Sequence, residues 1–245
     1  MRLVIRFFDS ILIYISIGFV CICALPFFIL ICCLPRSKRF KSVLFHYSTY
    51  YFFKVIIFVS RIKIHYHGFG KVLKRPVIFV ANHQSSLDIP LIGASMSEFP
   101  LIWLARSELE KSLLLKIALQ CCAIVTEVKN PKKSAFSLRQ FFRLLKNSAT
   151  CPVIFPEGSR YDDGLIHEFF NGFAFLARET NRPVIPILIE KAFQVYPRGA
   201  FLVNREPVIT LTQGPEFLIE PGESLDAFSV RIKNWFLQKS SNSGF

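Results

Sequence analysis

The feature that most restricts the fold is a run without any charged residue from Ser10 to Leu34. A helix needs about 20 predominantly apolar residues to cross the hydrocarbon core of a bilayer, and this run is longer than that. Pro26 lies inside the run, which a membrane helix tolerates because neighbouring groups satisfy the freed backbone carbonyl. The run therefore predicts a helix that anchors the chain in a membrane.

A cleaved signal peptide is the competing interpretation of this run. Its apolar core would be shorter, about 7–15 residues, and small residues of a cleavage site would follow it. Residues 35–41 instead read Pro-Arg-Ser-Lys-Arg-Phe-Lys, which favours an uncleaved anchor. The four basic residues of this flank outnumber Arg2 and Arg6 on the other side, so the positive-inside rule predicts that the rest of the chain lies in the cytoplasm.

A second apolar stretch, residues 50–60, is interrupted by Lys54. It is too short to span a bilayer alone and is typical of an amphipathic helix that lies in the membrane interface. Residues 1–60 are therefore interpreted as a membrane-anchoring segment. Residues 61–245 are interpreted as one folded domain, which is an ordinary domain size.

Composition supports a membrane-associated protein. The chain is 52% hydrophobic, contains 27 Phe and carries a net charge of +13, and its mean hydropathy is +0.40. An apolar, basic chain is suited to a surface of anionic lipid or to an anionic substrate. Nucleic acid is not expected as a partner, because the basic residues are scattered and no nucleic-acid motif is present.

The seven cysteines show no C-x-x-C spacing, and four of them lie in the N-terminal apolar segment. An odd count in apolar surroundings predicts reduced, inert thiols. We therefore expect no disulfide and no metal. The pair His65 and His67 lies on the polar face of an alternating strand, where a solvated surface is the simpler interpretation.

Short apolar runs alternate with helical patterns after residue 60, which predicts an α/β fold with a mostly parallel or mixed sheet flanked by helices. This fold follows an N-terminal hydrophobic helix or helical pair. Strands are expected at 61–67, 77–80, 100–104, 123–126, 153–155, 183–190 and 207–212. Helices are expected at 88–97, 134–146, 173–180 and 225–239.

Polar residues that suit acid–base chemistry follow the second of these strands, in the segment Asn82-His83-Gln84-Ser85-Ser86-Leu87-Asp88. A general-base histidine needs a partner on one ring nitrogen, so that the other nitrogen can take a proton. Asp88, in the first turn of the next helix, could supply that partner to His83. Ser85 and Asp88 also fit a capping box, which would leave His83 as a loop histidine. One Asp can serve both purposes.

A second polar turn follows the strand at 153–155 and reads Pro156-Glu157-Gly158-Ser159-Arg160. Arginine suits a phosphate because its planar fork donates two hydrogen bonds to an anion. Glycine lets the backbone come close to a ligand. A surface turn with an incidental ion pair is the alternative.

The motifs N-H-x-S-x-x-D and F-P-E-G-S-R, about 70 residues apart, together resemble the glycerolipid acyltransferase family, specifically the 1-acylglycerol-3-phosphate acyltransferases. The resemblance covers residues 68–190. It implies transfer of an acyl chain from a thioester to the free hydroxyl of lysophosphatidate, giving phosphatidic acid, with His83 and Asp88 as catalytic residues. It assigns the binding of the acceptor's phosphate to Glu157, Gly158, Ser159 and Arg160. Some family members have an N-terminal helical pair that dips into one leaflet, and the sequence leaves spanning and dipping open.

Three positions depart from the family pattern. Arg106 replaces a lysine on the donor side and is the possible donor-side residue here, although Ser107 could simply cap a helix. Thr126 stands where an arginine often helps to hold the phosphate, and Lys129 is a possible substitute. Asn171 replaces a lysine before Gly172. These changes leave another lysolipid open as the acceptor.

The resemblance implies no cofactor, and acyl-CoA or acyl carrier protein is the co-substrate. Arg139, Arg143 and Lys146 recur on one face of the helix at 134–146, which suits a solvated surface, lipid phosphates or the acidic helix of a carrier protein. Two other functions are considered: a non-catalytic protein that binds anionic lipid, and a thioesterase. The thioesterase is disfavoured because no Ser or Cys nucleophile lies at a recognisable elbow.

Overall fold

The computed structural model describes all residues except 1, 71–72, 107–122, 127–130, 147 and 243–245. Its helices, listed in chain order, are α1 (Arg2–Cys32), α2 (Arg36–Arg39), α3 (Val43–Ser60), α4 (Asp88–Ser95), α6 (Pro131–Lys146), α7 (Gly172–Thr180), α8 (Ala192–Val195) and α9 (Leu225–Asn242). Its strands are β1 (Lys63–His67), β2 (Ile78–Ala81), β3 (Leu101–Arg106), β4 (Ala123–Thr126), β5 (Cys151–Ile154), β6 (Val184–Glu190) and β7 (Val208–Gln213).

The strands form one seven-stranded sheet in the order β1-β7-β6-β2-β5-β3-β4. Every described neighbouring pair is parallel except β6 and β7. The predicted α/β fold with a mixed sheet is therefore confirmed. Strand β2 lies in the middle, with Phe79 opposite Val153 of β5 and Ile185 of β6. This position buries β2 on both faces, which explains why its sequence is a continuous apolar run.

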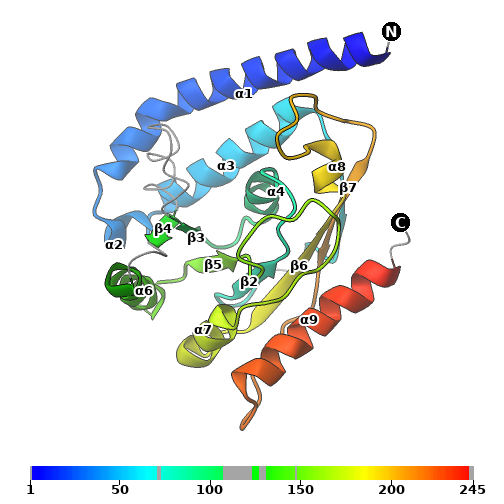
Figure 1. The fold of residues 1–245 in the computed structure, drawn as a ribbon. Coiled ribbons are helices and arrows are strands. Elements are labelled where there is room, and N and C mark those ends of the chain that lie inside the picture. Colours follow the sequence, from blue (N-terminus) through cyan, green and yellow to red (C-terminus); the bar gives the residue numbers. More distant parts are fainter. Residues whose placement is uncertain (1, 71–72, 107–122, 127–130, 147, 243–245) are drawn as a thin grey trace.

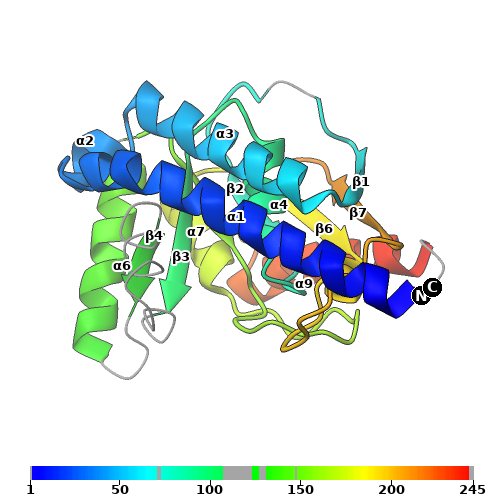
Figure 2. The same cartoon turned by 90° about the horizontal axis from the view of Figure 1, so that it is seen from above.

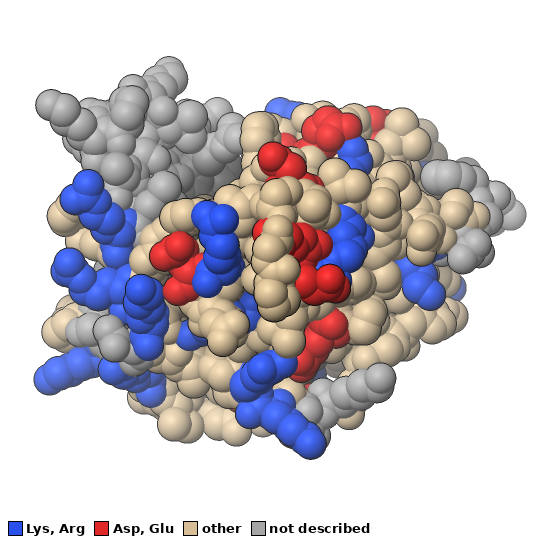
Figure 3. Space-filling view, turned by 90° about the horizontal axis from the view of Figure 1, so that it is seen from below, with Lys and Arg blue, Asp and Glu red and all other residues tan. Residues whose placement is uncertain are grey.

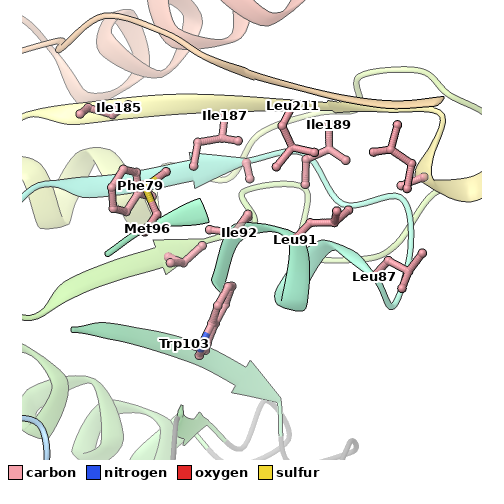
Figure 4. Packing of buried hydrophobic residues seen from close by; sticks show 14 of the residues in the cluster. Phe79, Leu87, Leu91, Ile92, Met96, Trp103, Ile185, Ile187, Ile189 and Leu211 are labelled. Atoms are coloured by element: carbon pink, nitrogen blue, oxygen red, sulfur yellow. The ribbon is translucent and has the colours of Figure 1, made fainter. Parts of the chain in front are cut away.

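Helices cover both faces of the sheet (Figure 1). Alternate side chains of β2 point to opposite faces, because successive residues of a strand alternate. Phe79 packs with α4 residues such as Leu91 and Ile92 in one buried cluster, and the labelled residues of Figure 4 show this packing. Ile78 and Val80 belong to a second cluster, which contains buried residues of α6, α7 and α9.

Most predicted elements are present, with shifted ends. Strand β1 begins at Lys63 rather than at residue 61, because Arg61 adopts a left-handed backbone (φ 53°) that caps α3. Helix α4 ends at Ser95 rather than at residue 97, because Met96 is extended. Helix α6 begins earlier than expected, at Pro131, and proline is favoured at the first helical position.

The two N-terminal helices lie alongside each other across one side of the molecule (Figures 1 and 2). Both Leu3–Cys32 and Val43–Ser60 are long and apolar enough to cross a bilayer, a criterion of length and composition that buried core helices and signal sequences also meet. The stretch at 50–60 thus belongs to a longer helix than expected, which starts after the Ser42 cap. Its length therefore no longer excludes a crossing.

Helix α1 contacts the loop between α8 and β7 through an ion pair and two hydrogen bonds. Asp9 forms an ion pair with Arg205, and Ser10 Oγ accepts a hydrogen bond from the backbone N–H of Val203 at 2.9 Å. The Tyr14 hydroxyl donates to the carbonyl of Phe201 at 2.9 Å. The apolar outer side of α1 remains exposed, as at Phe19 and Leu30. The first half of α1 is therefore held against the α/β unit through Asp9, Ser10 and Tyr14.

One expectation about the cysteines is wrong. Cys32, the last residue of α1, is disulfide-bonded, although we expected all seven thiols to be reduced. The thiols of Cys21, Cys23, Cys33 and Cys151 are free. Which thiols meet depends on the tertiary fold, and neither their spacing nor their apolar surroundings reveals it.

Candidate active site

The side chains of His83 and Asp88 meet just beyond the carboxyl end of β2. The Asp88 carboxylate contacts His83 Nδ1 at 2.7 Å through its Oδ2 atom. The same oxygen accepts hydrogen bonds from the backbone N–H groups of Gln84 at 2.7 Å and Ser85 at 2.8 Å. Asp88 is fully buried, with 0% exposure. All three contacts are made by Oδ2, while the buried Oδ1 has no hydrogen-bond partner among the described residues.

Asp88 is also the first residue of α4, where the helix dipole favours a negative charge. Its bond to the Ser85 N–H is the acid half of a capping box. In a capping box the serine side chain would accept from the N–H of Asp88, whereas Ser85 Oγ accepts from the N–H of Leu87 at 3.3 Å. The Asp88 carboxylate therefore bonds both to His83 and to the turn before α4, but the expected capping box is not complete, because the N-cap residue is Leu87 and makes no side-chain capping hydrogen bond.

The imidazole of His83 is held in a fixed plane. Its ring stacks on Phe155, with centroids 4.0 Å apart and planes 17° apart, and Phe155 stacks in turn on Trp103. The side chain remains 18% exposed. Among the described residues Nε2 has no hydrogen-bond partner. This nitrogen is the one able to exchange a proton with a substrate.

The turn after β5 lies beside His83, because β2 and β5 are neighbouring parallel strands whose carboxyl ends meet at one edge. Gly158 has φ +68°, and its N–H donates to the carbonyl of Phe155 at 3.1 Å. A glycine suits this left-handed conformation. Ser159 is exposed, and the half-buried Arg160 donates to Ser86 Oγ. Arg160 thus reaches from the second motif to the first.

Glu157 is buried between the two motifs. Its Oε2 accepts from the backbone N–H of His83 at 2.9 Å, and its Oε1 accepts from that of His167 at 3.1 Å. Burial raises the pKa of Glu157, against the effect of these hydrogen bonds. The carboxylate therefore connects the loops after β2 and β5 through backbone groups. The family resemblance groups Glu157 with the phosphate-binding residues, and no sequence pattern indicates its contacts with the two backbone N–H groups.

Asn82 is a supporting residue to which the sequence had assigned no role. Its side-chain nitrogen donates to the carbonyl of Ile189 at 2.8 Å, and its oxygen accepts from the N–H of the same residue at 2.8 Å. Asn82 is fully buried. This two-bond contact fixes the end of β2 to β6, and a polar amide directly after a buried strand was its only signal.

Some predicted residues lie partly or wholly outside the described part of the chain. Arg106 is the last residue of β3, and its backbone pairs with Thr126 of β4. The carboxyl end of β3 lies at the same edge as those of β2 and β5. Lys129 and Ser107 lie outside the described residues. The side chain of Asn171 is described and donates to the Asp226 carboxylate.

A buried carboxylate on a histidine at the carboxyl edge of a mixed sheet, with an arginine turn beside it, is the arrangement expected of an acid–base site next to a turn that suits an anion. A family model described as Acyltransferase matches residues 63–190, more than half of the chain. The chain belongs to this acyltransferase family. The resemblance between its motifs and those of the glycerolipid acyltransferases is confirmed at this level.

Three similar curated proteins have related names. Probable 1-acyl-sn-glycerol-3-phosphate acyltransferases of Mycoplasma pneumoniae and Mycoplasma genitalium are 31% and 28% identical over 63% and 67% of this chain. A 1-acyl-sn-glycerol-3-phosphate acyltransferase of Limnanthes alba is 24% identical over 63% of this chain. The matches span 57%, 66% and 54% of the lengths of these relatives.

A similar fold occurs in the crystal structure of the 1-acyl-sn-glycerophosphate (LPA) acyltransferase PlsC from Thermotoga maritima. The TM-score is 0.79, and the alignment covers 99% of this chain and 97% of that one. The sequence identity is 21%. The agreement in fold includes the N-terminal helices, because nearly all of both chains is aligned.

Proposed function

We propose that this chain is a 1-acylglycerol-3-phosphate O-acyltransferase, which converts lysophosphatidate to phosphatidic acid in phospholipid biosynthesis. The observation that carries the proposal is the contact of His83 with the buried Asp88, which the Glu157 carboxylate links to the turn that bears Arg160. One edge of the sheet thus combines a base for a hydroxyl group with a cation for a phosphate. The names of the similar curated proteins support the same reaction.

In the proposed reaction, Nε2 of His83 removes the proton of the free hydroxyl as its oxygen attacks the thioester carbonyl. A bond forms between that oxygen and the acyl carbon. The carbon–sulfur bond then breaks, and the thiolate takes the proton from the imidazolium. Asp88 stabilises the imidazolium while it exists. The substrate hydroxyl acts directly, so no acyl-enzyme is required.

Arg160 and Ser159 hold the acceptor's phosphate in this proposal. A guanidinium can bind two phosphate oxygens at once, which fixes the head group in orientation as well as in position. Holding the hydroxyl near the base in this way can lower the barrier by several kcal/mol, and by about 7–11 kcal/mol in the best-oriented cases. Glu157 positions the two loops, since both of its oxygens accept from backbone N–H groups.

A second candidate function is acylation of another lysolipid. The observation that favours it concerns Asn171, where the family usually has a lysine. Its amide is bound to the Asp226 carboxylate, so this position brings no cation to an acceptor. Transfer to zwitterionic or uncharged lysolipids, measured beside transfer to lysophosphatidate, separates the two functions. The acyl donor is acyl-CoA or acyl carrier protein, with no other cofactor.

We also propose that residues 1–60 anchor the enzyme in one leaflet, with the domain of residues 61–245 on the cytoplasmic face. The contacts of Asp9, Ser10 and Tyr14 with the loop at 201–205 support this arrangement. A helix α1 standing across the bilayer would carry that loop into hydrocarbon, where its backbone polar groups are costly to bury. The exposed basic residues of Figure 3 lie mostly towards the end that carries α6. Arg139, Arg143 and Lys146 of α6 are exposed there and suit lipid phosphates or an acidic carrier protein.

The leaflet arrangement is tested by cysteine labelling in sealed vesicles. Single cysteines are placed at Arg2, the first residue of α1, and at Lys41, which lies beyond the other end of α1 and just after α2. If α1 lies in one leaflet, an impermeant reagent labels both positions from the cytoplasmic side. Labelling of the two positions from opposite sides would show that α1 spans the membrane.

The function is tested by an acyl-transfer assay with labelled acyl donor and lysophosphatidate. We expect wild-type protein to make phosphatidic acid, His83→Ala to abolish the reaction, and Arg160→Ala mainly to raise the acceptor KM. Matched controls are His65→Ala on the exposed face of β1 and Arg178→Ala on the exposed face of α7. Full activity of His83→Ala would refute the mechanism. Lipid binding without any transfer by the wild type would indicate the non-catalytic alternative, and release of free acid without acceptor a thioesterase.

A further inference from the structure

Residues 156–170, between β5 and α7, form a compact loop over the edge of the sheet that carries the site (Figure 1). Its two ends are joined, because the N–H of Phe170 donates to the carbonyl of Pro156 at 2.9 Å. Near its second end, the side chains of Ile166 and Phe169 pack against a buried core cluster. Loops with adjacent ends and internal packing of this kind hold a defined shape.

The loop contains a second histidine–aspartate pair, which the proposed reaction does not use. His167 Nε2 contacts Asp163 Oδ2 at 2.8 Å. The other oxygen of Asp163 accepts from the N–H of Leu165 at 3.0 Å, across a turn in which Gly164 has φ +77°. The His167 ring also lies parallel to Tyr161, with centroids 3.6 Å apart and planes 15° apart. These contacts close the tip of the loop just after Arg160.

The loop that carries this tip is hydrogen-bonded to both backbone groups of His83, its carbonyl and its N–H. The N–H of Tyr161 donates to the carbonyl of His83 at 2.9 Å. The N–H of His83 donates to one oxygen of Glu157, and the N–H of His167 donates to the other. Arg160 therefore lies between Glu157 and Tyr161, which both bond to the backbone of His83, and the stacking of Tyr161 on His167 joins this segment to the second half of the loop.

The same contacts contribute little to the stability of the whole fold. The side chains of His167 and Asp163 are 29% and 43% exposed, and exposed ion pairs contribute on the order of 0–1 kcal/mol. Stabilisation of the folded core therefore does not explain the contact between His167 and Asp163. A displacement of about 1 Å at a reacting group, in contrast, can slow an enzyme by about 10²-fold.

We infer that Tyr161, Asp163 and His167 are positioning residues that fix Arg160 relative to His83, so that the anionic head group of the acceptor is held at one distance from the base. The inference rests on the proposed function for its substrate. It adds three residues outside the two motifs, none of which contacts the reacting atoms.

The test compares Tyr161→Ala, His167→Ala and Asp163→Asn with wild type in the acyl-transfer assay. We expect kcat/KM for lysophosphatidate to fall about 10- to 100-fold, with the acceptor KM raised and the donor KM unchanged. Tyr161→Phe keeps an aromatic ring against His167 and restores most of the loss. The thermal midpoint changes little in all of these variants, and His65→Ala is the unaffected control.

A double-mutant cycle with Arg160→Ala identifies how the loop acts. If His167 acts through Arg160, adding His167→Ala to Arg160→Ala causes less than about a threefold further loss. Additive losses, or single variants with wild-type acceptor KM, would overturn the inference.

A binding measurement separates this inference from the proposed function. Lysophosphatidate binding is measured with detergent-solubilised His83→Ala protein, with and without His167→Ala, so that no turnover is needed. Binding weakened by His167→Ala, and not weakened further in an Arg160→Ala background, supports the positioning role even if the wild type transfers no acyl chain. Binding that His167→Ala leaves unchanged counts against it.

Discussion

Replacing Asp88 by Asn removes a charge while leaving room for nearly the same hydrogen bonds. The three groups around Oδ2 are His83 Nδ1 and the N–H groups of Gln84 and Ser85, at 2.7–2.8 Å. An asparagine carbonyl can accept from all three. The amide nitrogen then takes the place of Oδ1, a buried atom with no hydrogen-bond partner among the described residues. We therefore expect a folded protein that is destabilised by about 1–3 kcal/mol, the cost of an unsatisfied buried donor.

The effect on the reaction is much larger than the effect on folding. When His83 takes the proton, the imidazolium and the Asp88 carboxylate have charge centres about 4 Å apart, which at an effective dielectric constant near 20 corresponds to an attraction of about 4 kcal/mol. Asparagine cannot supply this attraction in the transition state. A barrier higher by about 4 kcal/mol slows the chemical step by about 10³-fold.

The assay is steady-state acyl transfer to lysophosphatidate in detergent or vesicles, with folding checked by thermal unfolding. We expect kcat to fall about 10³-fold while both KM values stay within about threefold, since Asp88 touches neither substrate. Glu216→Gln is the matched control, because it removes the same charge from an exposed pair with Arg75. A folded Asp88→Asn protein within tenfold of wild-type kcat would refute a charged His–Asp pair as the base.

Three further predictions concern the support of the site and can be checked by unfolding in detergent. Asn82→Ala leaves the N–H and carbonyl of Ile189 unsatisfied and should cost about 2–5 kcal/mol; an unchanged midpoint would contradict the two-bond contact. Gly93→Ala puts a methyl group into the ring of Phe53 and should cost about 1–3 kcal/mol, and its loss combined with Phe53→Ala should be smaller than the sum of the single losses. Burial raises the pKa of Glu157 above its ordinary value of 4.5, so the folded state holds this proton more tightly than the unfolded chain. The wild type should therefore lose stability relative to Glu157→Gln as pH rises above about 4.5, and a pH-independent difference in Tm would contradict the raised pKa.

Local sequence pattern was sufficient for most elements of the α/β unit. The run at 77–80 predicted β2, and the alternation at 61–67 predicted β1 within two residues. Errors occurred at element ends, where single backbone conformations decide. Arg61 is left-handed and Met96 is extended, and neither residue type requires such a conformation. The longer α3 was missed because aromatic and polar residues before Tyr50 interrupt the apolar run.

The candidate site was predictable where its residues are close in sequence. His83 and Asp88 are five positions apart, and the start of a helix at Asp88 is enough to turn that carboxylate back onto the histidine. The contact of Glu157 with the His83 backbone joins residues 74 positions apart. Asn82 and Ile189 are 107 positions apart. No local pattern encodes such pairs.

The sequence by itself therefore determined which segments are buried strands, where the His83–Asp88 pair and the turn that bears Arg160 lie along the chain, and that the N-terminus is apolar enough for a membrane. Only the tertiary structure decided that β5 and β6 flank β2, that α1 packs on the loop at 201–205, and that Cys32 is oxidised. The physical reason is the distance along the sequence over which each kind of interaction acts. Periodicity and capping act over a few residues, whereas the neighbours of a strand or a thiol are selected by how all apolar faces are buried together.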